Sequence, residues 1–168
     1  MDQRAGRGGT ATPLYTAAQR ARRDSSRWTL VQAVLAPLQF LVFLVSLALV
    51  LRYLVSGDGW WAASASVVAK TATLYAIMVT GALWEKDVFG QYLFAAAFFW
   101  EDVVSMLVIA LHTAYLVALL TDGLSPQGQM HLALAAYASY VVNAVQFLLK
   151  FRAARLHARP STRLAGVA

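Results

Sequence analysis

Apolar residues gather into four long runs along the chain, separated by short polar segments. Each run is close to the ~20 residues that a helix needs to cross the ~30 Å hydrocarbon core of a bilayer. The turn formers of residues 56–59 and 121–126 end the first and third runs. We therefore predict an all-α integral membrane protein, a bundle of four transmembrane helices with spans at about residues 28–54, 61–83, 98–120 and 130–151.

Polar residues inside the predicted spans recur with the helical period, so they fall on single faces. In the third span such a stripe steps by four, three, four and three residues. Its members are Glu101, Ser105, Val108, His112 and Tyr115. A similar face of the fourth span carries Ser139, Asn143, Gln146 and Lys150, and one of the first span carries Gln32, Gln39, Phe43 and Ser46.

The segment between the second and third spans concentrates negative charge. Residues 84–97 are predicted to form a loop broken at Gly90, and the segment and its continuation hold four of the eight acidic residues. Charge at the edge of hydrocarbon is costly and marks a candidate functional site. The four acids are Glu85, Asp87, Glu101 and Asp102.

Composition agrees with a membrane protein. Hydrophobic residues make up 60% of the chain and charged residues 13%, which leaves too little polar surface for a soluble fold. The chain has no cysteine, so disulfides, thiolate catalysis and cysteine-ligated metals are excluded. The net charge of +6 lies mainly in the two tails, and no nucleic-acid-binding motif surrounds the basic residues.

The distribution of lysine and arginine predicts the orientation. Basic residues concentrate before the first span and after the fourth, so both termini and the central loop are predicted to be cytoplasmic. Residues 1–27 are expected to form a disordered basic segment carrying a short surface helix after a Thr16–Gln19 capping box. Residues 28–151 would form the membrane domain, and residues 152–168 a basic tail.

Each candidate residue also has a structural explanation. Glu101 faces the polar stripe, whereas Asp102 can be a helix-end cap favoured by the helix dipole. His112 can be a core histidine bonded to a backbone carbonyl, and Lys70 can extend to the outer interface. Lys70 and His112 lie at similar depth on antiparallel spans, which predicts that they are neighbours. Glu101 and His112 are about 16 Å apart along one helix, so they can contact only different parts of a large ligand.

Three function classes remain open at this point: an enzyme, a small proton-coupled transporter, and a non-catalytic binding or assembly protein. A relay across the membrane requires polar residues at every depth, but the stripe of the third span stops at Tyr115. That pattern disfavours transport. No histidine or carboxylate pairs have metal-ligand spacing on any span, and no Gly-rich phosphate loop is present.

The segment from Trp84-Glu85-Lys86 through Phe98-Phe99-Trp100-Glu101-Asp102 to His112-Thr113-Ala114-Tyr115 resembles the 3-vinyl (2-vinyl in older ring nomenclature) bacteriochlorophyllide hydratases of photosynthetic bacteria. The similarity extends to residues 28–32, 35–40 and 143–147. It implies a hydro-lyase that adds water across the vinyl group of chlorophyllide a or bacteriochlorophyllide. The product would carry a 1-hydroxyethyl group, on the route to bacteriochlorophyll.

With a pigment as the implied ligand, the non-catalytic alternative is a pigment-binding or assembly protein. The implied reaction assigns roles to the acidic segment. A proton must reach the terminal vinyl carbon, after which water attacks the carbon beside the ring, so an acid and a base suffice and no cofactor is needed. A carboxyl facing hydrocarbon can keep its proton at neutral pH because desolvation disfavours its charge. Glu101 is predicted to be the acid, with Asp102 beside it. Glu85 is predicted to be a second acid or the group that activates water.

Other residues are predicted to bind the substrate. His112 could hold a water as base or approach the substrate's magnesium, and Tyr115 could donate to a ring carbonyl. The propionate requires a cation, either Lys70 or Lys86. Trp100 and Asn143 complete the predicted contacts. The expected partners are the magnesium tetrapyrrole substrate and the lipid bilayer of a bacterial inner, intracytoplasmic photosynthetic membrane. Self-association and contacts with other pigment-pathway enzymes remain open.

Overall fold

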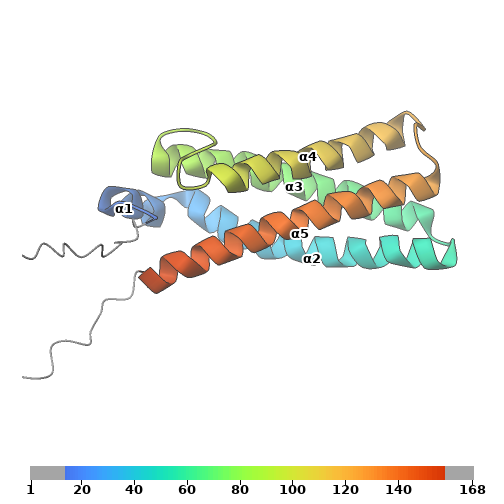
Figure 1. Cartoon of the computed structure of the whole chain (residues 1–168), viewed down its shortest axis with the longest axis horizontal. Helices are drawn as coiled ribbons and strands as arrows, with labels where there is room; N and C mark the ends of the chain where they lie inside the picture. The colour runs from blue at the N-terminus through green and yellow to red at the C-terminus, as the bar shows by residue number, and fades with distance from the viewer. Residues whose placement is uncertain (1–13, 158–168) are drawn as a thin grey trace, which may run out of the picture.

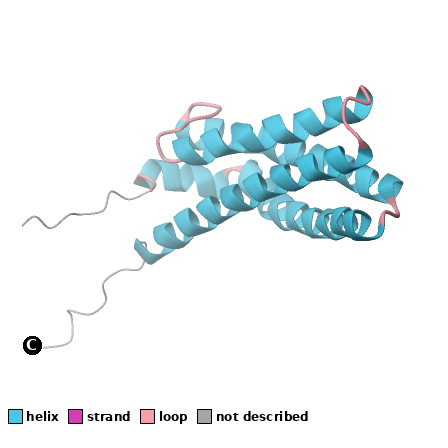
Figure 2. Ribbon diagram, turned by 45° about the vertical axis from the view of Figure 1, so that its right-hand side comes forward, coloured by secondary structure: helices cyan, strands magenta, loops and turns pink. Residues whose placement is uncertain are grey.

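A computed structural model describes residues 14–157, which form helices joined by short loops and contain no strand (Figure 2). Four of the helices are long and apolar enough to cross a membrane, which confirms the prediction of an all-α chain with four such helices. A fifth, short helix precedes them. The elements are α1 (Ala17–Ser25), α2 (Arg27–Ser56), α3 (Trp60–Phe89), α4 (Phe99–Leu120) and α5 (Pro126–His157).

The four long helices run lengthwise beside one another and form an elongated bundle (Figure 1). The closest packing is within two consecutive hairpins, α2 with α3 and α4 with α5, and the contact between the hairpins is sparser. Helix α1, the loop before α4 and the C-terminal end of α5 lie at the same end of the bundle. The cytoplasmic orientation of this end stays a prediction.

Helix α3 is longer than the sequence pattern predicted. Residues 84–89 were expected to be loop, but they continue the helix, so Glu85 and Asp87 lie on its last turns. The predicted end of the second span at residue 83 is therefore wrong. The helix ends at Gly90, which was predicted only as a break within the loop, because this residue adopts φ 87° and its N–H donates to the carbonyl of Lys86 at 3.0 Å. The charged residues were read as a loop because of their polarity, although none of them breaks a helix.

Helix α5 also extends beyond its predicted span of residues 130–151. It begins at Pro126, whose fixed φ suits the first helical position. The hydroxyl of Ser125 accepts a hydrogen bond from the N–H of Gly128 at 3.2 Å and so caps the helix. The turn before α5 therefore ends earlier than the apolar pattern indicated.

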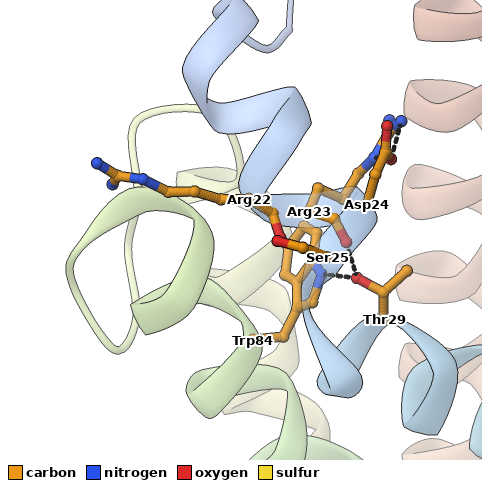
Figure 3. Close-up of polar contacts among 6 residues, drawn as sticks. All are labelled: Arg22, Arg23, Asp24, Ser25, Thr29 and Trp84. Atoms are coloured by element: carbon orange, nitrogen blue, oxygen red, sulfur yellow. Dashed lines mark hydrogen bonds and ion pairs between the residues drawn. The ribbon is translucent and has the colours of Figure 1, made fainter.

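Helix α1 is the short helix that the Thr16–Gln19 capping box predicted, and both reciprocal hydrogen bonds are present. Figure 3 shows how α1 is attached to the bundle: the hydroxyl of Thr29 donates to the carbonyl of Arg23 at 2.6 Å and accepts from the indole N–H of Trp84 at 3.0 Å. Tyr15 packs beneath α1. Burial raises the pKa of Tyr15, although the nearby Arg23 guanidinium opposes the shift.

The bundle buries its core between the two hairpins and exposes aliphatic side chains on its outside. Phe43 on α2 stacks edge-on against Tyr137 of α5 with ring centroids 5.4 Å apart. Outer residues such as Val55 and Leu120 are more than four-fifths exposed. An apolar exterior is suited to contact with lipid. Residues 1–13 and 158–168, including the predicted disorder and most of the predicted tail, lie outside the described residues.

Candidate active site

Two buried carboxyl groups meet where the end of α3 crosses the start of α4. Glu85 is 5% exposed and Asp102 is 3% exposed, and the two carboxyl groups are close enough for their charges to interact. Each also accepts a hydrogen bond from the loop between the helices, Glu85 from the amide of Ala95 at 3.2 Å and Asp102 from that of Phe94 at 2.7 Å. The loop therefore positions both carboxyls.

Glu101 points to a different partner. Its Oε2 lies 2.5 Å from the Nζ of Lys150 on α5, and its side chain is 9% exposed. Its neighbour Asp102 is close enough for the two charges to interact. Glu101 thus pairs with an ammonium group, whereas Glu85 and Asp102 lie next to each other. The three acids and Lys150 form one polar cluster, which we call the carboxyl cluster.

An aromatic cluster covers the end of the bundle next to the carboxyl cluster. Phe98 is 1% exposed and lies at its centre. The ring of Phe98 contacts Trp84 of α3 at 5.6 Å and Phe147 of α5 at 5.9 Å between centroids. Tyr15, before α1, packs on Phe98 at 6.5 Å. These contacts join three parts of the chain and hold the loop over the acids.

The loop and the first turn of α4 also present aromatic rings to the outside. Phe94, Phe99 and Trp100 are 40%, 44% and 69% exposed. Their ring centroids are 5.8 Å apart from Phe94 to Phe99 and 5.4 Å apart from Phe99 to Trp100. Phe94 has φ 59°, a left-handed conformation that is unfavourable for a bulky residue and is often found at functional sites. We call these three residues the aromatic ledge.

Lys70 and His112 are neighbours, as their predicted depths implied, but they lie inside the bundle. Both are 0% exposed. The ammonium of Lys70 lies 3.8 Å from the centroid of Tyr140, so it does not extend to the outer interface. His112 Nδ1 is 2.8 Å from the carbonyl of Val108, and its Nε2 has no hydrogen-bond partner.

Tyr115 and Asn143 are likewise buried between helices. The hydroxyl of Tyr115 has no hydrogen-bond partner. The amide of Asn143 donates to the hydroxyl of Ser105 at 2.8 Å and so ties α5 to α4. His112 is ten residues from Asp102, about 15 Å along α4, which separates these interior groups from the carboxyl cluster.

Lys86 is the exposed cation nearest in sequence to the cluster. Its ammonium donates to the carbonyl of Gly90 at 2.9 Å and lies 5.1 Å from the ring centroid of Tyr92. Because Lys86 is on the surface next to the loop, an anionic group can reach it, whereas Lys70 is buried. The two candidate cations for a carboxylate of the ligand are therefore distinguished by burial.

Sequence reasoning identified the acids but missed their pairing. The contact between Glu85 and Asp102 depends on α3 continuing through Phe89. The backbone amides of Phe94 and Ala95 that bond the acids cannot be identified from the sequence, because every residue except proline has such an amide. Lys150 was found on the polar face of the fourth span, but no role was assigned to it. Its position on the same face as Asn143 was the available signal, because that face meets the polar stripe of α4.

Comparison with known proteins identifies relatives of the whole membrane domain. The family model described as 2-vinyl bacteriochlorophyllide hydratase matches residues 15–153. A protein of that name from Cereibacter sphaeroides is 69% identical over 85% of this chain and 89% of its own length. Another from Rhodobacter capsulatus is 67% identical over 86% of this chain and 84% of its own length. No solved structure matches the chain. The chain belongs to the 2-vinyl bacteriochlorophyllide hydratase family.

Proposed function

We propose that the chain hydrates the vinyl group of a bacteriochlorophyllide-type magnesium tetrapyrrole at the carboxyl cluster, and that Glu85 and Asp102 carry the proton transfers. Membership of the hydratase family makes it a hydro-lyase of bacteriochlorophyll synthesis. The observation that supports the location is the contact between two buried carboxyls at the α3–α4 crossing. Two acids in contact hold one shared proton more readily than two negative charges.

Both proton transfers of the hydration can be carried out by this pair. The shared proton moves to the terminal vinyl carbon, and the positive charge that forms on the carbon beside the ring is delocalised into the macrocycle. Water attacks that carbon and forms the new C–O bond. The pair, now without its proton, accepts one from the attacking water and returns to its starting state. The negative charge of the pair stabilises the cationic intermediate because the site is shielded from bulk water.

Glu101 was the predicted acid, and it remains the alternative donor. Its Oε2 already accepts a hydrogen bond from Lys150, which makes it less suited to delivering a proton. We assign to it a supporting role: its charge lies beside Asp102 and favours positive charge on the substrate. The roles predicted for His112, Tyr115, Lys70 and Asn143 require the bundle to open, because these residues are buried.

The aromatic ledge is the proposed contact for the macrocycle. Its exposed rings are adjacent to the carboxyl pair, since the amide of Phe94 bonds Asp102 directly. A flat, delocalised ligand stacks favourably on such rings. Trp100 forms the outer edge of this surface, and Lys86 is the proposed partner of the substrate propionate. The location that we propose is a photosynthetic bacterial inner membrane.

The test is an absorption assay of the membrane-embedded protein with vinyl substrate. Hydration removes the vinyl group from conjugation, so the red band moves to shorter wavelength. We expect Glu85→Gln and Asp102→Asn each to bind pigment and to lose hydration by about 10²- to 10⁴-fold, the usual contribution of a general acid or base. Undiminished turnover in both variants would remove the pair from the mechanism. Unchanged absorption with folded wild-type protein would overturn hydration itself.

A further inference from the structure

Besides the carboxyl cluster, the described residues include a second polar contact between α3 and α4 on the outside of the bundle. This contact is a hydrogen bond of 2.7 Å between the hydroxyls of Tyr75 and Thr113. The hydroxyl of Thr113 already donates to the carbonyl of Ile109 at 2.8 Å, so Tyr75 is the donor in the contact between them. Thr113 is exposed on the outside of the bundle, and Tyr75 is half-buried. Each is in the middle part of a membrane-spanning helix.

The two contacts lie along a single seam. Tyr75 and Glu85 are ten residues apart on α3, and Thr113 and Asp102 are eleven residues apart on the antiparallel α4. Matching separations of about 15 and 16 Å are expected when two helices remain side by side over that length. The carboxyl pair therefore marks the loop end of the seam, and the Tyr75–Thr113 pair marks a position roughly three turns deeper.

Apolar, adaptable side chains lie between the two polar pairs. By helical period the intervening positions of the seam are Met78 and Ala82 on α3 and Met106 and Ile109 on α4, all half-buried. Methionine is flexible and polarizable, so it adjusts to the face of a flat ligand. Phe99, a member of the aromatic ledge, continues the same side of α4 at the loop end. The packing of α3 against α4 is looser than within either hairpin.

A hydroxyl pair on the lipid side of a membrane helix bundle needs a reason, because polar groups facing hydrocarbon are costly. We propose that Tyr75 and Thr113 are a second anchor for the tetrapyrrole, which lies along the α3–α4 seam with its vinyl end at Glu85 and Asp102 and a ring carbonyl of its opposite edge bonded to the Tyr75 hydroxyl. This inference rests on the proposed function. Thr113 holds the phenol hydroxyl at the seam in the free protein, and on binding the single phenol proton turns from Thr113 to the ring carbonyl. The separation of about 15 Å along the seam matches contacts at two opposite edges of a large macrocycle.

Such an arrangement accounts for selection of the vinyl group that reacts. An amphiphilic disc in the membrane can slide and rotate, whereas contacts at two opposite edges fix its register. A tetrapyrrole without the carbonyl would bind in several orientations and present its vinyl group less often. Tyr75 and Thr113 are thus positioning residues, not catalytic ones.

The experiment measures the stretching frequency of the ligand's ring carbonyl. An analogue with ethyl in place of vinyl cannot be hydrated, so its resonance Raman spectrum can be recorded while it is bound. In the wild-type protein we expect a carbonyl stretch lowered by hydrogen bonding. In Tyr75→Phe we expect the frequency of the unbonded carbonyl and an affinity about 3- to 10-fold weaker, as for a lost neutral hydrogen bond. For the vinyl substrate, kcat/KM should fall by a similar factor.

Two further variants complete the test. Thr113→Val removes the acceptor that competes with the ring carbonyl for the single phenol proton, so it should leave the carbonyl bond in place or strengthen it. Thr73→Val is the matched control, because the Thr73 hydroxyl bonds only the carbonyl of Lys70 in its own helix at 2.8 Å. Identical carbonyl frequencies in wild type and Tyr75→Phe, with pigment bound in both, would overturn the proposal and leave the pair as an interhelical contact. If Glu85→Gln and Asp102→Asn retain turnover while Tyr75→Phe loses the carbonyl shift, the anchor stands and the catalytic assignment falls.

Discussion

The environment of each acid, more than its position in the sequence, decides what it can do. Glu85 and Asp102 face each other and two loop amides, whereas Glu101 faces the ammonium of Lys150. The first arrangement can store a proton, and the second neutralises a charge. Adjacent residues on one helical turn, Glu101 and Asp102, therefore receive different roles.

The Glu101→Gln variant distinguishes support from proton donation. If Glu101 only favours positive charge on the substrate, we expect pigment binding to persist and kcat to fall by about tenfold, the effect of roughly 1.4 kcal/mol. The same absorption assay measures it, with the pigment-binding titration as control. A fall as large as that of Glu85→Gln would instead assign the proton transfer to Glu101.

Lys70 offers a test of an interior charge. It is 0% exposed, and its Nζ has no hydrogen-bond partner. Replacing a buried, unpaired polar group with an apolar one of similar length removes its desolvation cost. We expect Lys70→Met to raise the melting temperature in detergent, by the equivalent of about 1–3 kcal/mol. A lower melting temperature would show that the contact of the ammonium with the ring of Tyr140 outweighs the desolvation cost.

The end of α3 is the element on which the carboxyl cluster depends. Gly90 ends the helix with φ 87°, and the following loop returns its amides to Glu85 and Asp102. An added Cβ at Gly90 would meet nothing within 4 Å, so its cost is conformational. The position of the loop amides that bond the two acids therefore depends on the backbone conformation at Gly90.

Gly90→Ala should destabilise the protein by about 1–2 kcal/mol, the cost of a left-handed backbone for a residue with Cβ. Gly81→Ala is the matched control, because this glycine lies inside α3 and its added Cβ would meet only the amide of Gln32 at 3.8 Å. The control should gain about 0.5–1 kcal/mol. Thermal unfolding in detergent, followed by circular dichroism, measures both. Equal shifts in the two variants would contradict the role of Gly90 as a helix end.

The bundle as a whole places the α3–α4 loop, next to the carboxyl cluster and the aromatic ledge, at the same end as α1. If the basic segments are cytoplasmic, as the charge distribution predicts, substrate chemistry takes place at the cytoplasmic face of the membrane. A pigment diffusing in the lipid would then reach the site laterally, along the looser contact between α3 and α4.

The orientation can be tested with single cysteines, because the chain has none. We expect a membrane-impermeant thiol reagent added outside intact spheroplasts to label Asp58→Cys, in the α2–α3 turn, and not Gln91→Cys, in the loop before α4. Permeabilised cells should show labelling at both positions. The cysteine-free parent controls for background, and the reverse pattern would invert the topology.

The sequence by itself determined the four spans, the capping box of α1 and the break at Gly90, because these depend on local composition, length and backbone preference. It also placed Glu101 and Asp102 on neighbouring but different faces. Only the tertiary structure decided which groups meet: Glu85 with Asp102, Glu101 with Lys150, and Tyr75 with Thr113. Helical period gives the direction of a side chain on its own helix, but its partner depends on which helices pack together and on their relative register.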